Sequence, residues 1–149
     1  MKVIAWSHNL KQEDCEKVGV RYVNSTDLFK MSDILTIHTR LSDRTKGYID
    51  KNNLRLMKKE SVVVNTSRGP IINEKDLIDA LNNKVISFAA LDVYDQEPLP
   101  SEHILRRTKN VILTPHIGYV SFEAYEKFFS GYFDAIKAYI NDKCINQIL

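Results

Sequence analysis

The sequence predicts an α/β fold built on an incomplete, doubly wound parallel sheet with flanking helices, and three observations point to it. Short apolar, β-branched runs alternate along the chain with stretches of helical period, separated by polar or Gly/Pro breaks. Several runs are continuously apolar, as in Val62-Val63-Val64, which is typical of strands buried on both faces of a parallel sheet. The length of 149 residues, with 44% hydrophobic and 27% charged, suits an ordinary globular core.

Six segments are predicted as strands because they are short, apolar and rich in β-branched residues. They are Lys2–Trp6, Arg21–Val23, Ile34–His38, Ser61–Asn65, Ser87–Val93 and Val111–Thr114. Connections between parallel strands are right-handed, and ligands of such sheets bind beyond the carboxyl ends of the strands. Functional residues are therefore expected just after each strand.

Five segments between and after these strands are predicted as helices. They are Lys11–Val18, Ser25–Lys30, Asn52–Met57, Asn73–Leu81 and Ser121–Ile140. Ser25 or Thr26 is a suitable cap for the second helix, and Asn73 followed three residues later by Asp76 resembles a capping box.

The last predicted helix has an aromatic face. Ser121 is its expected cap, and apolar residues follow at helical spacing: Phe122, Tyr125, Phe128, Phe129, Tyr132, Phe133, Ile136, Tyr139 and Ile140. Such a stripe packs in a core or against another subunit far more often than it binds a ligand.

Composition excludes several classes of protein. The net charge of only +2 argues against a nucleic-acid or membrane surface built on charge. No apolar run is long enough to span a bilayer, and the first residues lack the apolar stretch of a secretory signal. Cys15 and Cys144 are far apart and without metal-ligand spacing, so we interpret them as reduced thiols of a cytosolic protein.

Three ionisable side chains follow the last three predicted strands: Arg68, Glu97 and His116. Each alone has a structural explanation, as a solvated guanidinium, a polar loop residue or a hydrogen-bonded histidine. Together they suit proton transfer beside an anion site. A histidine changes charge near neutral pH, a carboxylate can hold its ring, and a guanidinium can bind a carboxylate with two hydrogen bonds.

Several other residues at the strand ends have more than one possible role. Asp92 either caps the following turn or accepts a hydrogen bond from a cofactor amide, and Gly69 and Gly118 serve backbone conformation or close approach to a ligand. His38 fits a hydrogen-bonded core histidine better than a catalyst. A nucleophilic hydrolase is not favoured, because no base is paired in the sequence with the hydroxyls of Ser42, Thr66 and Ser67.

Three segments resemble the D-isomer-specific 2-hydroxyacid dehydrogenases, the family of D-lactate, D-glycerate, D-3-phosphoglycerate and formate dehydrogenases. They are Asn65–Asn73, Ala90–Pro100 and Thr114–Gly118, which contain Thr66-Ser67-Arg68-Gly69-Pro70, Asp95-Gln96-Glu97-Pro98 and Pro115-His116-Ile117-Gly118. Their order and spacing match the family, and the likeness covers nearly the whole chain. The resemblance implies that residues 1–149 form part of a Rossmann-like dinucleotide-binding domain, from its second strand onward.

The resemblance also implies roles for individual residues. Arg68 would bind the substrate carboxylate, Glu97 would hold the histidine in its charged form, and His116 would be the acid/base. The reaction would be hydride transfer between a D-2-hydroxy acid and its 2-keto acid, with NAD as cofactor. The residues that would line the cofactor are Ser7, Thr39, Thr66, Ser67, Asp92 and Gly118.

Two residues depart from the family pattern. Ser7 stands where members often have an aspartate that holds the adenosine ribose. Serine removes the negative charge that disfavours a 2′-phosphate, so the choice between NAD and NADP stays open, with His8 or Lys11 able to assist a phosphate. Arg40 stands where the family often has proline, a minor change on the cofactor loop.

The five glycines are too far apart for the G-x-G-x-x-G phosphate loop. The likeness also lacks the first strand of the cofactor domain and the N-terminal substrate domain, so we expect a truncated product, the second half of a split gene or a fragment. Three functions compete: an oxidoreductase part that is inactive alone and is complemented by the missing N-terminal half, a non-catalytic binding or oligomerisation module such as a homodimer, and a poorly folding remnant.

Overall fold

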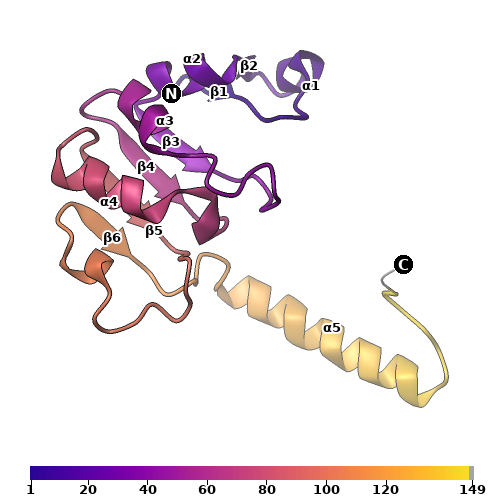
Figure 1. The fold of residues 1–149 in the computed structure, drawn as a ribbon. Coiled ribbons are helices and arrows are strands. Elements are labelled where there is room, and N and C mark those ends of the chain that lie inside the picture. The colour runs from indigo at the N-terminus through magenta and orange to yellow at the C-terminus, as the bar shows by residue number, and fades with distance from the viewer. Residues whose placement is uncertain (148–149) are drawn as a thin grey trace. The chain divides into compact units, whose positions relative to one another are not determined.

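The computed structural model describes residues 1–147, which form two compact units (Figure 1). The first unit is Met1–His116 and the second begins at Ile117. The first contains six strands and four α-helices, and the second contains one long helix.

All strands of the first unit are parallel to their neighbours. β1 (Ile4–Ala5) pairs with β2 (Arg21–Tyr22), and a separate four-stranded sheet has the order β3-β4-β5-β6. The strands of that sheet are β3 (Ile34–Ile37), β4 (Val62–Asn65), β5 (Phe88–Leu91) and β6 (Val111–Leu113). Each of the six lies within the range predicted for it, so the predicted parallel α/β fold is confirmed.

The five predicted helices are also present, and none of their ends differs from the prediction by more than one residue. They are α1 (Gln12–Lys17), α2 (Ser25–Met31), α3 (Lys51–Leu56), α4 (Glu74–Asn82) and α5 (Phe122–Ile140). Two 3-10 helices, η1 (Gly69–Ile71) and η2 (Ile104–Arg107), were not expected from the sequence, since three or four residues are too few to show a helical period.

The caps test the local predictions. The side chains of Asn73 and Ser121 cap α4 and α5 as expected, accepting hydrogen bonds from backbone N–H groups three residues later, at 3.1 and 3.2 Å. The prediction for α2 is wrong by one residue. Asn24 caps that helix, accepting from the N–H of Asp27 at 2.8 Å, and Ser25 is already helical.

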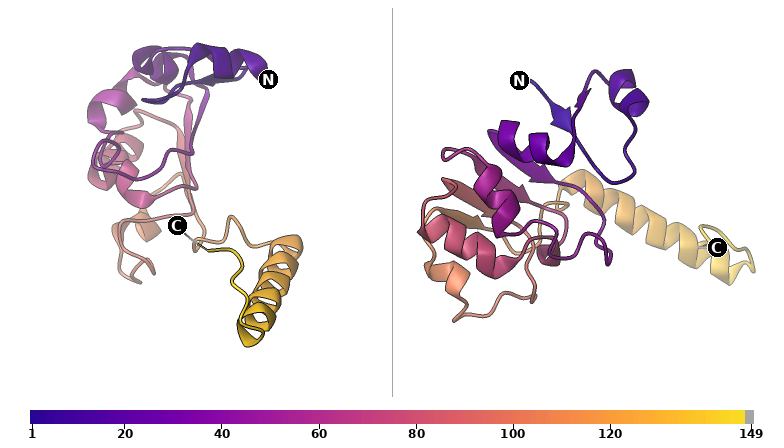
Figure 2. Two further views of the ribbon diagram at one scale, coloured as in Figure 1. Left: turned by 90° about the vertical axis from the view of Figure 1, so that its right-hand side faces the viewer. Right: turned by 45° about the horizontal axis from the view of Figure 1, so that its top comes forward.

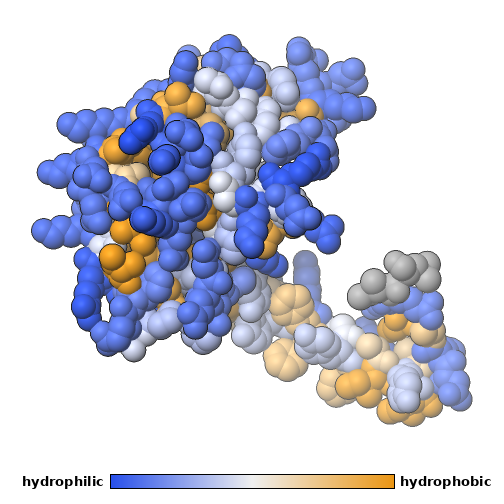
Figure 3. Space-filling model, in the orientation of Figure 1, coloured by the Kyte–Doolittle hydropathy of each residue, from blue (hydrophilic) through white to orange (hydrophobic). Residues whose placement is uncertain are grey.

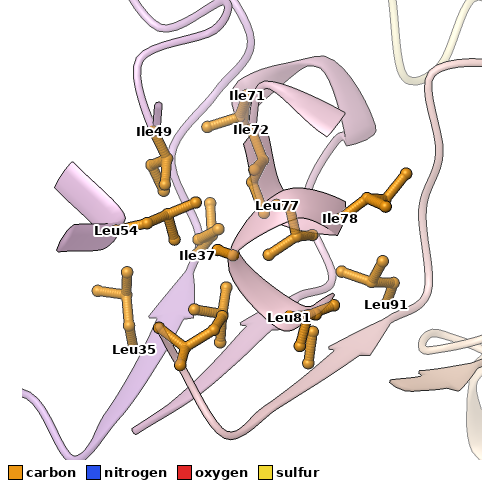
Figure 4. Packing of buried hydrophobic residues seen from close by; sticks show 14 of the residues in the cluster. Leu35, Ile37, Ile49, Leu54, Ile71, Ile72, Leu77, Ile78, Leu81 and Leu91 are labelled. Carbon is orange, nitrogen blue, oxygen red and sulfur yellow. The ribbon is translucent and has the colours of Figure 1, made fainter. Parts of the chain in front are cut away.

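The core of the first unit lies between the sheet and three helices, α2, α3 and α4. Figure 4 shows the part of this core formed by α3, α4 and the strands. Leu54 of α3 and Val63 of β4 are fully buried there, and Leu77 of α4 packs in the same cluster. Burying each such side chain stabilises the fold by roughly 1.5–3 kcal/mol. This layer holds the strands in place and so fixes the positions of the loops at their carboxyl ends.

The opposite face of the sheet is largely uncovered within this unit (Figure 2). Along β3, β4 and β5, buried residues alternate with more exposed ones, and Ile34 and Ile112 are 59% and 56% exposed. The expectation of strands buried on both faces is therefore wrong for the described residues. The reason is that α2, α3 and α4 all pack on the same face.

The second unit is built on α5, whose apolar residues stand out in Figure 3. None of the residues of α5 is buried, and the contact predicted for its aromatic face, in a core or against another subunit, stays a prediction. Phe129 contacts the rings of Tyr125 and Tyr132 along the helix, with centroids 6.1 and 6.5 Å apart. No helix among residues 1–147 is sufficiently long and apolar to cross a membrane. Cys15 and Cys144 are both free thiols.

Candidate functional site

Glu97 and His116 meet at the carboxyl ends of β5 and β6. The Nδ1 atom of His116 lies 2.6 Å from Oε2 of Glu97, and the two side chains are 35% and 34% exposed. The loops after two neighbouring parallel strands lie at the same edge of the sheet. Glu97 and His116, which are 19 residues apart in sequence, can therefore form a direct hydrogen bond. The sequence predicts that Arg68, Glu97 and His116 meet around one pocket, and this contact brings two of the three together.

His116 has an unusual backbone conformation. Its φ of +56° lies in the left-handed region, which a side chain with a Cβ seldom occupies, and its N–H donates to the carbonyl oxygen of Thr114 at 3.1 Å. Non-glycine residues in this region cluster at functional sites, where the surrounding structure holds them. The turn places the imidazole beside Glu97.

The environment of Glu97 favours its ionised form. Burial by itself would raise the pKa of this carboxyl, but the hydrogen bond with His116, the hydrogen bond from the Tyr94 N–H and the charges of His116 and Arg68 outweigh it and lower the pKa. The Tyr94 N–H donates to Oε1 of Glu97 at 2.9 Å, so each carboxylate oxygen has its own donor. A carboxylate fixed in this way can hold an imidazole ring by accepting a hydrogen bond from it.

The loop that carries Glu97 is braced at two points. The hydroxyl of Tyr94 donates to the carbonyl oxygens of Leu91 and Thr114 at 3.1 and 2.8 Å, which ties β5 to the residue after β6. The guanidinium of Arg106 donates to the carbonyl oxygens of Leu99 and Pro100 at 2.8 and 2.9 Å. Burial and the nearby carboxylate of Asp92 raise the pKa of Tyr94, so it remains a neutral donor at physiological pH.

His103 anchors the same loop to α4, a role that the sequence did not indicate. Its Nε2 lies 3.2 Å from Oε1 of Glu74, and its Nδ1 accepts from the N–H of Leu105 at 3.3 Å, capping η2. Burial raises the pKa of Glu74, the charge of Asp95 adds to this, and His103 partly offsets it. Glu74 and His103 are 29 residues apart in sequence, and only the folded loop brings them together.

A pocket of about 580 Å³ opens beside the Glu97–His116 pair. Both side chains line it, together with the mainly apolar walls formed by Tyr94, Pro98, Leu99, Arg106, Leu113, Thr114 and Pro115. A small, largely apolar pocket with a few converging polar groups is typical of a small-molecule site.

Arg68 lies at the same sheet edge, after β4. Its position depends on Asn65, which is 1% exposed: the side-chain amide donates to the carbonyl of Arg68 at 2.9 Å, and its oxygen accepts from the N–H of Ser67 at 3.0 Å. The guanidinium of Arg68 donates to the carbonyl of Ser67 at 2.6 Å and is exposed. Arg68 does not line the pocket, and its connection to the pair is electrostatic, through its effect on Glu97.

Gly69 lets the Arg68 loop approach the Glu97 loop closely. A Cβ at Gly69 would lie 2.6 Å from the backbone nitrogen of Asp95 and closer still to the carbonyl group of Tyr94. The neighbour that this glycine approaches is the protein's own backbone, whereas the sequence analysis offered a special backbone conformation or close approach to a ligand.

Small polar side chains occupy the neighbouring strand ends. Ser67 Oγ donates to the carbonyl of Thr39 at 2.6 Å, which links the loops after β3 and β4. Asp92, 6% exposed, accepts a short hydrogen bond from the Thr114 hydroxyl, and Thr66 is exposed beside them. These four predicted cofactor residues, Thr39, Thr66, Ser67 and Asp92, therefore share one edge of the sheet.

The remaining predicted residues are placed differently. Ser7 follows β1, outside the four-stranded sheet, and is half-buried, while Gly118 is exposed and belongs to the second unit. The expectation that His38 is a core histidine is wrong: its ring is exposed, and its Nε2 lies 2.9 Å from the hydroxyl of Thr36. The reason is that His38 follows β3 at the open edge, beyond the cover of the helices.

A parallel sheet with polar groups gathered beyond its carboxyl ends is the architecture of nucleotide-binding α/β domains. The family model "D-isomer specific 2-hydroxyacid dehydrogenase, NAD binding domain" matches residues 1–118. The chain therefore belongs to the D-isomer-specific 2-hydroxyacid dehydrogenase family, and the matched part is its NAD-binding domain.

Individual relatives agree with this assignment. The glyoxylate reductase of Aeropyrum pernix is 43% identical over 116 residues, which are 78% of this chain and 35% of that protein. The hydroxypyruvate reductase of Blautia hydrogenotrophica is 33% identical over 148 residues, 99% of this chain and 46% of the relative. The crystal structure of a phosphoglycerate oxidoreductase from Vibrio cholerae superposes with a TM-score of 0.85 at 30% identity, covering 95% of this chain and 46% of that one. The chain thus spans less than half the length of these relatives.

Proposed function

We propose that this chain provides the proton-transfer and carboxylate-binding residues of a D-2-hydroxyacid dehydrogenase. The reaction would interconvert a D-2-hydroxy acid and its 2-keto acid. The observation that carries the proposal is the 2.6 Å contact between His116 and Glu97 at the wall of a small pocket. Membership of the family supports the reaction type.

His116 is proposed as the acid/base. During reduction of a 2-keto acid, the carbonyl oxygen must gain a proton, and an imidazolium can supply it from Nε2 while Nδ1 stays on Glu97. Glu97 fixes the orientation of the ring through the contact at Nδ1, and its own lowered pKa keeps it ionised at neutral pH. In the reverse direction, the neutral imidazole would take the proton from the hydroxyl group.

Arg68 is proposed to bind the substrate carboxylate. A guanidinium presents two parallel N–H donors to a carboxylate, which lysine cannot do, and it stays charged throughout the physiological range. Its location after β4, with its charge acting on Glu97, supports a position near the reacting groups. Arg68 recognises only the carboxylate that all 2-hydroxy acids share, so it does not select among them.

The residues at the strand ends suit the nicotinamide side of NAD. Thr39, Thr66, Ser67 and Asp92 supply hydroxyls and a carboxylate along one edge, and Asp92 would accept a hydrogen bond from the nicotinamide amide. Bound there, the cofactor supplies or accepts the hydride. These 149 residues contain no glycine-rich phosphate loop. Ser7 leaves NADP open as an alternative, and Gly118 remains a proposed cofactor residue.

The proposal includes a partner. We infer that residues 1–149 act as a partial dinucleotide-binding domain of a cytoplasmic enzyme and need the N-terminal half of the family fold to complete the site; a homodimer is a further possible assembly. The isolated chain should show negligible oxidation of NADH with glyoxylate, hydroxypyruvate or pyruvate. Clear turnover by the isolated chain would contradict this inference.

A graft tests the proposed reaction. The part of this chain that aligns with the Aeropyrum pernix glyoxylate reductase would replace the matching segment of that enzyme. Reduction of glyoxylate by NADH would then be followed. We expect an active enzyme in which Arg68→Lys lowers kcat/KM by about tenfold or more, mainly through KM, because one of two parallel hydrogen bonds is lost. A folded graft without activity, or an Arg68→Lys variant with unchanged KM, would refute the assignment.

A second function, as an oligomerisation module, is favoured by α5. Its aromatic residues include Phe122, Phe129 and Phe133, which are 75%, 62% and 66% exposed, and large exposed apolar patches on soluble proteins mark interaction sites. Sedimentation of the purified chain tests this function: a self-associated species that Phe129→Glu dissociates supports it, and a well-behaved monomer counts against it. A broad, non-cooperative thermal melt would instead indicate a poorly folding remnant.

A further inference from the structure

His103 makes a different contact with each of its two ring nitrogens. Its Nε2 lies 3.2 Å from Oε1 of Glu74, the first residue of α4, and both side chains are 22% exposed. Its Nδ1 accepts a hydrogen bond from the N–H of Leu105 at 3.3 Å and thereby caps η2. The ring therefore fastens the loop to α4 and fixes the start of η2 at the same time.

The short helix η2 holds one wall of the pocket. Leu105 is 1% exposed and belongs to the core cluster, which anchors η2 to the first unit. Next to it, the guanidinium of Arg106 donates to the carbonyl oxygens of Leu99 and Pro100 at 2.8 and 2.9 Å. Leu99 and Arg106 both line the pocket beside Glu97. A change at the start of η2 is therefore transmitted to the pocket wall through Arg106.

The two contacts of His103 require one particular arrangement of protons. A ring nitrogen that accepts a hydrogen bond carries no hydrogen, so Nδ1 is bare and the single hydrogen of the neutral ring lies on Nε2. From Nε2 it is donated to the carboxylate of Glu74. A charged ring carries a hydrogen on both nitrogens, so it keeps the contact with Glu74 and loses the cap of η2.

The charges around the ring oppose this cap. Burial raises the pKa of Glu74, an effect that His103 opposes and Asp95 reinforces. Burial also raises the pKa of Asp95, and the charges of Lys46 and His103 oppose that rise. Both carboxylates thus attract a charged His103, whereas the N–H of Leu105 requires a neutral one. The other charged side chains in the same loop are Glu102, Arg106 and Arg107.

We propose that His103 is a positioning residue that couples the order of the pocket wall to the protonation of its own ring. The neutral ring holds both α4 and η2. A ring that has taken up a proton from solvent keeps Glu74 and releases η2, which loosens the hold of Arg106 on the wall. Histidine changes charge between about pH 5 and 8, so the release falls in that range. Its effect on a bound 2-keto acid rests on the proposed function, whereas the release itself does not.

The test uses the full chain without substrate. Amide hydrogen exchange is followed by NMR between about pH 8 and about pH 5.5, and the Cε1–H signal of His103 reports the titration of its ring. We expect the protection factor of the Leu105 N–H to fall by about fivefold or more, the effect of losing one helix cap, with the midpoint of the His103 titration. The Nε–H of Arg106 should lose protection with the same midpoint.

The cap of α2 is the internal control. The N–H of Asp27 donates to the side-chain oxygen of Asn24 at 2.8 Å. Because an amide side chain does not take up a proton in this pH range, the protection factor of Asp27 should stay constant.

A matched pair of variants separates the two contacts of the ring. The amide oxygen of asparagine takes the place of Nδ1 and caps η2, whereas the amide nitrogen of glutamine reaches the place of Nε2 and donates to Glu74. We expect His103→Asn to keep Leu105 protected at every pH. His103→Gln should leave Leu105 as weakly protected at about pH 8 as it is in the unmodified chain at about pH 5.5.

Three results would overturn the proposal: a protection factor of Leu105 that does not change with pH, a change whose midpoint differs from the titration of His103, or the same pH dependence in His103→Asn. If His103→Asn does not fold, the first two results decide alone. An inactive graft would refute the proposed function and would leave these exchange results unaffected, so the two failures are distinguishable.

Discussion

Replacing Gly69 by alanine tests how closely the two loops of the candidate site pack. The added Cβ would lie 2.6 Å from the backbone nitrogen of Asp95, whereas ordinary contacts between such atoms are about 3.5 Å. The obstacle is backbone, which cannot rotate away as a side chain can. The loop after β5 must therefore move by about 1 Å or more.

The expected cost follows from that displacement. Overpacking a tight contact typically costs 1–3 kcal/mol, and this contact is at the severe end, so we expect Gly69→Ala to lower the free energy of unfolding by about 3 kcal/mol. For a chain of this size, that corresponds to a fall in Tm of about 10 °C. The shift would also strain the 2.9 Å hydrogen bond from the Tyr94 N–H to Glu97.

Thermal and denaturant unfolding, followed by circular dichroism, measure this effect. Gly131→Ala is the matched control, because a Cβ at Gly131 in α5 meets nothing within 4 Å. That variant should be neutral or should stabilise the helix by up to about 1 kcal/mol. If Gly69→Ala has the same Tm and free energy of unfolding as the unmodified chain, the two loops do not pack as closely as described.

Three further predictions concern single side chains. Glu97→Gln should lower the free energy of unfolding by up to about 1 kcal/mol at neutral pH. The value is modest because the carboxylate is 34% exposed. Folding lowers the pKa of Glu97 below its ordinary value of 4.5. Its contribution to the free energy of unfolding is therefore present above pH 4.5 and disappears as the pH falls through the folded-state pKa. An equal difference in stability between the unmodified chain and Glu97→Gln at all pH values would contradict this prediction. Asn65→Ala should cost about 2–3 kcal/mol in chemical denaturation, because it leaves buried partners of two hydrogen bonds unsatisfied in the Arg68 loop, and a cost below about 0.5 kcal/mol would disprove that role. Leu54→Ala should cost 2–5 kcal/mol in the same assay because it opens a cavity at a fully buried position; a smaller cost would mean that α3 is not part of the core.

The sequence was sufficient for the framework of the first unit. Apolar runs such as Val62-Val63-Val64 identified strands because a buried strand needs little else, and helix caps such as Asn73 were visible because their partners lie three residues away. The pairing of Glu97 with His116 was also accessible, since the carboxyl ends of parallel strands share an edge.

What the sequence did not reveal depends on contacts between distant segments. The His103–Glu74 contact joins a loop residue to the first residue of α4, and no local pattern marks either residue. The tight approach at Gly69 depends on where the loop after β5 passes. The one-sided cover of the sheet depends on which face each helix takes, and the apolar runs of the strands do not contain that information.

The claim that His116 is the proton donor is tested most directly by single-turnover reduction of glyoxylate. The rate is compared between the grafted enzyme and its His116→Asn variant. If His116 is the proton donor held by Glu97, the rate of reduction should fall by 10²-fold or more, roughly the contribution of general acid catalysis, while the affinity for NADH stays the same. Equal losses in rate and in NADH affinity would contradict the claim and indicate a structural role for His116.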